Sequence, residues 1–138
     1  MTAAVVTHIP VPRRLLRGER RPQIALVGLP RAGKSTIFQA ASSTAVDSGG
    51  LAGSTLAYST CRINIGLEQA DLVDLPSVRT FHDLADADRL VLMALFGGQP
   101  GKGGFRAPDL LIQVVDATLL EPSLALSQEL CELGKPLV

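Results

Sequence analysis

Short apolar runs alternate with polar or glycine-rich segments along this chain. Residues 23–27 are mostly apolar and end at Gly28, a pattern typical of a strand buried on both faces of a parallel sheet. Residues 34–41 have helical character and follow the glycine-rich turn directly. Further apolar segments predict strands at residues 59–65, 70–73 and 110–115, and the start of another at 136–138.

Two more helices are predicted, at residues 83–96 and 122–133. The second has Pro122 in its first turn and Gly134 just past its end, where these residue types are favoured. Loops are predicted at residues 42–54, which we expect to be mobile, and at 66–69 and 97–104. Strands that alternate with helices predict an α/β fold with a mostly parallel sheet, flanked by helices and joined by right-handed crossovers.

The length of 138 residues suits one domain, predicted at residues 23–138, after a basic, disordered tail at residues 1–22. The alternative for the tail is an anchor to a membrane surface or a partner. Its positive residues Arg13, Arg14 and Arg17 follow its apolar stretch, which argues against a signal peptide. No apolar run approaches the ~20 residues that cross a bilayer, so a cytoplasmic chain is expected.

Composition narrows the range of partners. Lys plus Arg and Asp plus Glu each count 13, and this zero net charge argues against a broad nucleic-acid surface. Cys61 and Cys131 lack the spacing of metal or redox motifs, so both are expected to be buried free thiols.

The segment Gly28-Leu-Pro-Arg-Ala-Gly-Lys-Ser35 matches the phosphate-binding P-loop in full, between a predicted strand and a predicted helix. Its glycines allow the backbone to approach a ligand closely, and its N–H groups and the helix N-terminus can hold phosphate oxygens. Lys34 supplies a positive charge to the β- and γ-phosphates, and Ser35 offers a hydroxyl to Mg²⁺. The chain is therefore expected to have a P-loop NTPase fold.

Asp74 ends a short apolar strand downstream of the P-loop. A carboxylate in this position is a Walker-B arrangement, which holds Mg²⁺, usually through water. Asp116 also follows a predicted strand, but we expect it to form a turn or a helix cap.

The residues after the tail resemble the cytosolic G domain of the ferrous-iron transporter FeoB. Residues 24–36 are similar to the first GTPase motif of that family, and Ala52-Gly-Ser-Thr55 stands where the family has Pro-Gly-Val-Thr. Asp74-Leu-Pro-Ser77 stands where it has Asp-Leu-Pro-Gly. Residues 108–118 and 130–136 resemble the later strand and helix of the family.

The resemblance implies binding of GTP and GDP with Mg²⁺, and slow GTP hydrolysis that regulates Fe²⁺ passage through a transmembrane iron-permease domain or subunit. It places the domain at the cytoplasmic face of the inner membrane. It also implies that Thr55, in switch I, completes the coordination of Mg²⁺. The expected catalytic residues are Lys34, Thr55 and Arg31, and the expected metal ligands are Ser35, Thr55 and Asp74. The residues expected to bind nucleotide are Gly28, Leu29, Pro30, Arg31, Ala32, Gly33, Lys34, Ser35, Thr36, Gly53, Ser54, Thr55, Asp74, Leu75, Pro76 and Ser77.

The sequence departs from the family pattern at three points. Ser77 replaces a glycine whose N–H meets the γ-phosphate, and Ser restricts the backbone. Arg31 replaces an asparagine that helps to hold an activating potassium ion in the family. These 138 residues also lack the Asn-Lys-x-Asp motif that reads guanine, so the chain is expected to be the front part of a G domain, and selection of GTP over ATP rests on the resemblance.

Two other functions are open at this point. The first is a degenerate nucleotide-binding module that does not hydrolyse, which Ser77 and the missing guanine motif favour. The second is a P-loop kinase for a small molecule, which would need a lid with arginines. Arg106, beside the glycine-rich loop, is the one hint of such a lid.

Overall fold

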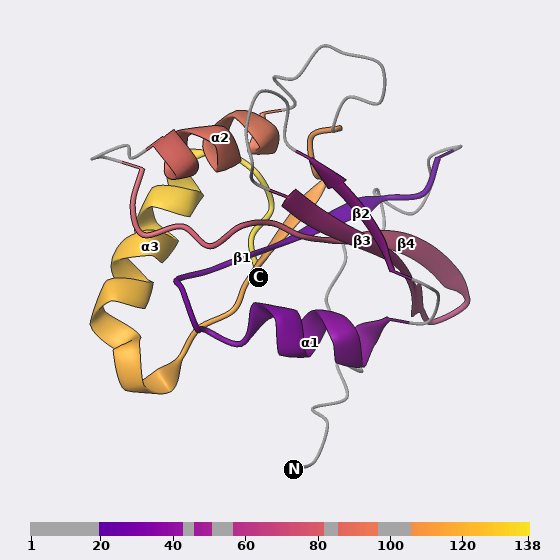
Figure 1. Ribbon diagram of the computed structural model, residues 1–138, viewed down its shortest axis with the longest axis horizontal. Helices are drawn as coiled ribbons and strands as arrows, with labels where there is room; N and C mark the ends of the chain where they lie inside the picture. Colours follow the sequence, from indigo (N-terminus) through magenta and orange to yellow (C-terminus); the bar gives the residue numbers. More distant parts are fainter. Residues whose placement is uncertain (1–19, 43–45, 51–56, 82–85, 97–105) are drawn as a thin grey trace.

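The computed structural model describes residues 20–42, 46–50, 57–81, 86–96 and 106–138 (Figure 1). Within them a five-stranded sheet has the order β2-β3-β4-β1-β5. The elements are β1 (Gln23–Val27), α1 (Lys34–Ala41), β2 (Asp47–Gly50), β3 (Ala57–Ile65), β4 (Glu68–Asp74), α2 (Asp86–Leu95), β5 (Leu110–Gln113), the 3₁₀ helix η2 (Ala117–Leu119) and α3 (Leu120–Glu132).

Strand β1 lies at the centre of the core because all five of its residues are buried. Its side chains alternate between the two faces of the sheet, as the strand period requires. Ile24 and Leu26 pack with Phe38 of α1, whereas Ala25 and Val27 join a cluster with buried residues of α2 and α3. Figure 1 shows α1 on one side of the sheet and α2 and α3 on the other. The predicted α/β fold with helices on both faces is confirmed.

Pairing in the sheet is mixed, so the expected predominance of parallel strands holds only for one half. Strand β1 pairs in parallel with β4 and β5, whereas β2–β3 and β3–β4 are antiparallel. The reason is a hairpin: Ile65 pairs with Glu68, and Gly66 adopts a positive φ of 61° in the turn between them. The connection is therefore shorter than the predicted 66–69.

The prediction of a loop at residues 42–54 is wrong for the segment that forms β2. Asp47 pairs with Thr60, and Gly50 with Ala57, so the backbone groups of this polar segment bond to those of β3. Its composition gives no sign of this pairing, because the hydrogen bonds come from a neighbouring strand and not from local preference.

The other elements agree with the prediction to within a few residues. The bounds of β1 and α1 are as predicted, β5 ends two residues before the predicted 115, and α3 starts two residues before Pro122. The C-terminal segment does pair with the sheet, because Leu137 forms a parallel bridge with Leu111. The predicted loop at residues 97–104 and residues 1–19 of the tail lie outside the described residues.

The last residues of the predicted tail contact the sheet. Arg21 Nε lies 3.1 Å from Asp71 Oδ1, and the Pro22 carbonyl accepts a 2.9 Å hydrogen bond from the Asp71 N–H. Cys61 is buried as expected, but Cys131 is exposed, because it lies on the outer side of α3. None of the helices in the described part of the chain is both long and apolar enough to cross a membrane.

Candidate nucleotide-binding site

The P-loop connects the buried end of β1 to the start of α1. Two of its residues have left-handed backbones, Arg31 with φ 62° and Gly33 with φ 99°. A hydrogen bond of 3.2 Å from the Ala32 N–H to the Leu29 carbonyl tightens the turn. Among the described residues no side chain caps α1 at Gly33, so the first-turn N–H groups remain available to an acceptor. The partial positive charge at a helix N-terminus favours an anion there.

Gly28 has a steric reason to be glycine. A Cβ atom at this position would lie 2.8 Å from the backbone carbonyl oxygen of Val114, closer than real Cβ contacts. The Val114 N–H in turn donates a 2.9 Å hydrogen bond to the Val27 carbonyl. The P-loop therefore begins directly against the backbone that follows β5, and any side chain at residue 28 would push the two apart.

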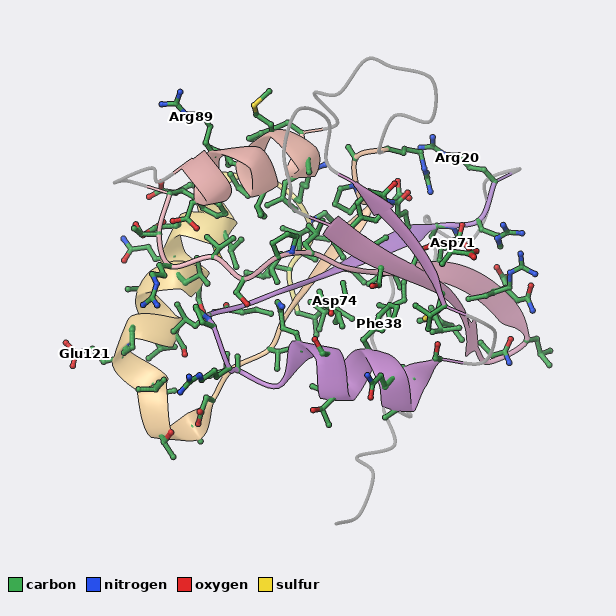
Figure 2. All side chains as sticks on the ribbon, in the orientation of Figure 1. Arg20, Phe38, Asp71, Asp74, Arg89 and Glu121 are labelled. Atoms are coloured by element: carbon green, nitrogen blue, oxygen red, sulfur yellow. The ribbon has the colours of Figure 1, made fainter. Side chains whose placement is uncertain are left out.

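Three side chains that the sequence analysis singled out meet at the start of α1. Lys34 Nζ lies 3.3 Å from Asp74 Oδ1, and Ser35 Oγ donates a 3.0 Å hydrogen bond to Asp74 Oδ2. Only 7% of the Lys34 side chain and 14% of the Asp74 side chain are exposed, so this ion pair is largely shielded from water. Figure 2 labels Asp74 between the strands and α1. The lysine, the hydroxyl and the carboxylate are thus held together at the start of α1.

A pocket of about 300 Å³ opens over this group. Its walls are Leu29, the P-loop and first α1 turn at residues 31–36, and Ser77 from the segment after β4. Arg31 and Lys34 bring positive charge to this lining, which suits a phosphate. Arg31 is exposed, whereas Lys34 is buried and paired.

The remaining predicted nucleotide-binding residues fall into two groups. Gly53, Ser54 and Thr55 lie outside the described residues, so the structure does not place them. Leu75 is 1% exposed and belongs to the core, which leaves only its backbone to face a ligand. Pro30 and Pro76 are half-buried, and neither is among the residues that line the pocket.

The segment after β4 is held at both ends, and one of its contacts could not be foreseen. The Val78 N–H donates a 3.0 Å hydrogen bond to the Gly28 carbonyl, and the Val78 side chain is fully buried. Glu129 on α3 accepts hydrogen bonds from the Thr80 hydroxyl, at 2.9 Å, and from the Phe81 N–H. No local motif marks Glu129, because its partners lie 49 and 48 residues away in the chain.

Asp116 caps the helix that follows it, as expected. Its carboxylate accepts hydrogen bonds from the Thr118 hydroxyl, at 2.7 Å, and from the Thr118 N–H, at 2.9 Å. These two hydrogen bonds lower the pKa of the Asp116 carboxyl below 3.8. Asp116 therefore has a structural role at the start of η2.

Arg106 lies at the amino end of β1, whereas the P-loop follows the carboxyl end. Its guanidinium donates to the Gln23 side chain at 3.2 Å, to Asp109 at 3.2 Å and to the Arg21 carbonyl at 3.0 Å. These contacts join the segments that enter β1 and β5. The geometry therefore gives Arg106 a structural role and offers no support for a kinase lid.

Comparison with known proteins agrees with this geometry. Residues 22–138 match the family model described as ferrous iron transport protein B. The Fe(2+) transporter FeoB of Helicobacter pylori is 33% identical over 119 residues, which are 83% of this chain and 17% of that protein. The chain thus spans about a sixth of that curated relative.

Two solved structures have the same fold. The cytosolic domain of the T. maritima FeoB iron transporter in its GMPPNP form has a TM-score of 0.72 at 25% identity, covering 84% of this chain and 43% of that one. A GDP-bound mutant of the S. thermophilus FeoB G-domain has a TM-score of 0.70 at 25% identity, covering 84% and 41%. The chain belongs to the ferrous iron transport protein B family and corresponds to the G domain of its members.

Proposed function

We propose that this chain binds GTP and GDP, hydrolyses GTP slowly with Mg²⁺, and regulates ferrous iron transport as part of a longer protein. The observation that carries the proposal is the buried Lys34 held beside Asp74 and Ser35, at a helix N-terminus that no described side chain caps. A buried ammonium paired with one carboxylate, under an open pocket, is suited to receive phosphate oxygens.

Each residue has a definite task in this proposal. The first-turn N–H groups of α1 and the P-loop backbone bind the phosphates, and Lys34 turns from Asp74 toward them. Ser35, Asp74 and Thr55 are the side chains that would hold Mg²⁺. When bound, Mg²⁺ neutralises charge on the phosphate oxygens. Asp74 keeps a role in both states, as the partner of Lys34 in one and beside the metal in the other.

Slow hydrolysis is expected because the described residues that line the pocket include no side chain suited to orient an attacking water. Val78, which follows Ser77 where many small GTPases have a water-orienting glutamine, is fully buried in the core. Among the described lining residues there is neither a carboxylate nor a glutamine that could orient an attacking water. We therefore expect a turnover well below 1 per second without a partner, as in GTPases that wait for an activating protein.

Guanine recognition and iron transport are inferred from the relatives. The similar T. maritima and S. thermophilus structures carry GMPPNP and GDP, and the former is a cytosolic domain. The curated relatives are Fe(2+) transporters of which this chain spans a small part. We infer that this domain acts at the cytoplasmic face of a membrane, next to an iron-permease domain or subunit.

Binding of fluorescent GDP and GTP to the parent and to Lys34→Ala tests the proposal. The loss of charge-assisted contacts to phosphate should weaken binding roughly 10- to 100-fold. Arg89→Ala is a matched control, because Arg89 is an exposed cation on α2, away from the P-loop (Figure 2). Equal affinity of Lys34→Ala and the parent would show that the P-loop does not bind nucleotide.

A non-hydrolysing binding module is the second candidate, and Ser77 favours it. Ser77 lines the pocket, and the family resemblance implies that the backbone N–H at this position meets the γ-phosphate, where a serine restricts the backbone more than glycine does. Single-turnover hydrolysis separates the two candidates: phosphate release after GTP binding supports the GTPase, and binding without release supports the inert module.

A further inference from the structure

The segment at residues 75–81 connects the pocket to helix α3. At the pocket end Ser77 forms part of the lining, and the Val78 N–H is bound to the Gly28 carbonyl of the P-loop. The side chain of Val78 is fully buried, which fixes this end a second time. A movement of Ser77 therefore reaches the rest of the segment only if Val78 leaves one of these two contacts.

The other end of the segment contacts α3 in two ways: the Phe81 side chain packs against the core cluster that includes Leu126 and Leu130, and Thr80 and Phe81 hydrogen-bond to Glu129. The carboxylate of Glu129 receives the Thr80 hydroxyl on one oxygen and the Phe81 N–H on the other. Hydrogen bonds to an ionised acceptor are roughly twice as strong as neutral ones. All three residues are half-buried, so water competes only in part for these bonds.

Helix α3 is itself fixed to the sheet on the side of β5. The Gln113 side-chain amide donates to the Ser123 carbonyl at 2.8 Å, and the Ser127 hydroxyl donates to the Gln113 side-chain oxygen at 2.5 Å. Leu126 and Leu130 of α3 are also buried in the core. Glu129 therefore connects residues 80 and 81 to a helix, α3, that is itself fixed to the sheet.

Only Arg79 lies between the residue bound to the P-loop and the first residue bound to Glu129. One residue spans at most about 3.6 Å of chain, so the connection has little slack. Because Arg79 is exposed, packing does not hold it. A displacement that moves Val78 would therefore also move Thr80 and Phe81.

We propose that Glu129 is a latch that couples the nucleotide pocket to α3. It is closed when the pocket holds no γ-phosphate, and it opens when a nucleoside triphosphate draws the backbone of Ser77 inward. The inference rests on the proposed function, because it requires nucleotide in this pocket. The triphosphate can open the latch only through its stronger binding to the open form, so weakening the latch must raise the affinity for triphosphate relative to diphosphate.

Hydrogen exchange at the Phe81 amide tests the latch in the full 138-residue chain. In the parent this amide should exchange slowly without nucleotide and with GDP, and several-fold faster with GMPPNP. In Glu129→Gln it should exchange roughly 10- to 100-fold faster than in the nucleotide-free parent, since a charged acceptor is lost, and it should no longer depend on the nucleotide. The same variant should bind GMPPNP several-fold more tightly relative to GDP than the parent does.

Two further variants and one internal reference separate coupling from a loss of stability. Glu132→Gln removes an exposed carboxylate from the same helix and should behave as the parent. Thr80→Val removes one of the two hydrogen bonds and should give an intermediate exchange rate. The buried amide of Val73 in β4 reports global opening; in Glu129→Gln its exchange should rise by no more than the factor seen at Phe81, and it should not respond to the change from GDP to GMPPNP as Phe81 does in the parent.

These measurements distinguish a failure of the proposed function from a failure of the latch. If the parent binds neither GDP nor GMPPNP, the proposed function is wrong. If both bind but Phe81 exchanges equally in the two complexes, the proposed function stands and the latch is refuted. Unchanged Phe81 exchange in nucleotide-free Glu129→Gln would also refute it, because Glu129 would then not hold the segment at all.

Discussion

The ion pair between Lys34 and Asp74 makes a quantitative prediction about the chain without nucleotide. Asp74→Asn removes the negative charge and keeps the shape of the side chain, but only one of its two terminal atoms is still an oxygen, which can accept from either Lys34 or Ser35. Lys34 is only 7% exposed, so after the substitution its charge lies in a poorly hydrated place without a counter-ion. The substitution should therefore destabilise the folded chain even though it removes no atom from the core.

The magnitude follows from the burial of the pair. Removing one partner of a buried ion pair costs ~3–5 kcal/mol of folding free energy. Because the asparagine oxygen still accepts a hydrogen bond, we expect about 3 kcal/mol, the lower end of that range. Asp71→Asn is the matched control on the same strand, since the pair of Asp71 with Arg21 is 35% and 47% exposed. Exposed pairs contribute only about 0–1 kcal/mol.

Urea unfolding without nucleotide measures both variants, and a cycle with Lys34→Met isolates the coupling between Lys34 and Asp74. In Lys34→Met the substitution Asp74→Asn should cost far less, because no buried ammonium is left unpaired. Adding GDP in EDTA should reduce the loss of unfolding free energy caused by Asp74→Asn, because the phosphates supply Lys34 with a new counter-charge. The reasoning is refuted if Asp74→Asn and Asp71→Asn destabilise the chain equally, or if the cycle shows no coupling.

Three further predictions concern other parts of the fold. Gly28→Ala should cost ~1–3 kcal/mol by forcing a Cβ against the Val114 carbonyl, and should also weaken nucleotide binding. Gly134→Ala is the control, because Gly134 has a φ of 68° and open space around it. This substitution should lower the melting temperature but leave nucleotide binding unchanged. A thiol reagent should modify exposed Cys131 quickly and Cys61 slowly, because burial shields that thiol and raises its pKa above 9.0; equal rates would contradict the burial. The Thr118 hydrogen bonds keep the folded pKa of Asp116 below 3.8, so they stabilise the fold at neutral pH and are lost as the pH falls through the folded value. Melting temperatures of the parent and of Asp116→Asn should differ at neutral pH and converge in acid.

The sequence predicted correctly the elements whose residues are neighbours in the chain. The P-loop is contiguous, so the strand, the turn and the helix that surround it were predicted together, and Asp74 followed from its place at the end of a strand. The hairpin of β3 and β4, the edge strand β2 and the contact of Glu129 were not predicted. The hairpin has a local signal, the turn at Gly66, but the sequence analysis assigned residues 66–69 only as a connection. The strand β2 and the contact of Glu129 depend on residues brought together by the tertiary fold, where local preference carries little information.

The left-handed backbone of Arg31 was also not predicted from the sequence, although the sequence does show that arginine stands where the family has asparagine. Asparagine tolerates this conformation well among the residues with side chains, whereas arginine pays a conformational cost of ~1–2 kcal/mol. The family resemblance places asparagine at this position. A residue that is unfavourable for the backbone and exposed in the pocket lining suggests a role for its charge.

The last prediction is that GTP hydrolysis by this chain does not depend on potassium. Arg31 lines the pocket and is always charged, and its planar head carries several donors. A guanidinium beside the β- and γ-phosphates would supply the positive charge that a potassium ion supplies in the family, in the manner of an arginine finger within the same chain. The alternative is that Arg31 points to solvent and contributes nothing to the reaction.

Rates in potassium and sodium buffers of equal ionic strength, for the parent, Arg31→Asn and the control Arg89→Asn, decide between these two roles. If Arg31 acts on the phosphates, Arg31→Asn should slow hydrolysis in sodium and become stimulated by potassium, while the other two proteins respond to neither ion. Arg31→Asn should also raise the unfolding free energy of the nucleotide-free chain by up to about 1 kcal/mol, because asparagine accepts the left-handed backbone more readily. Strong potassium stimulation of the parent would show that the guanidinium does not replace the ion, and a gain in stability without any change in ion response would leave Arg31 pointing to solvent.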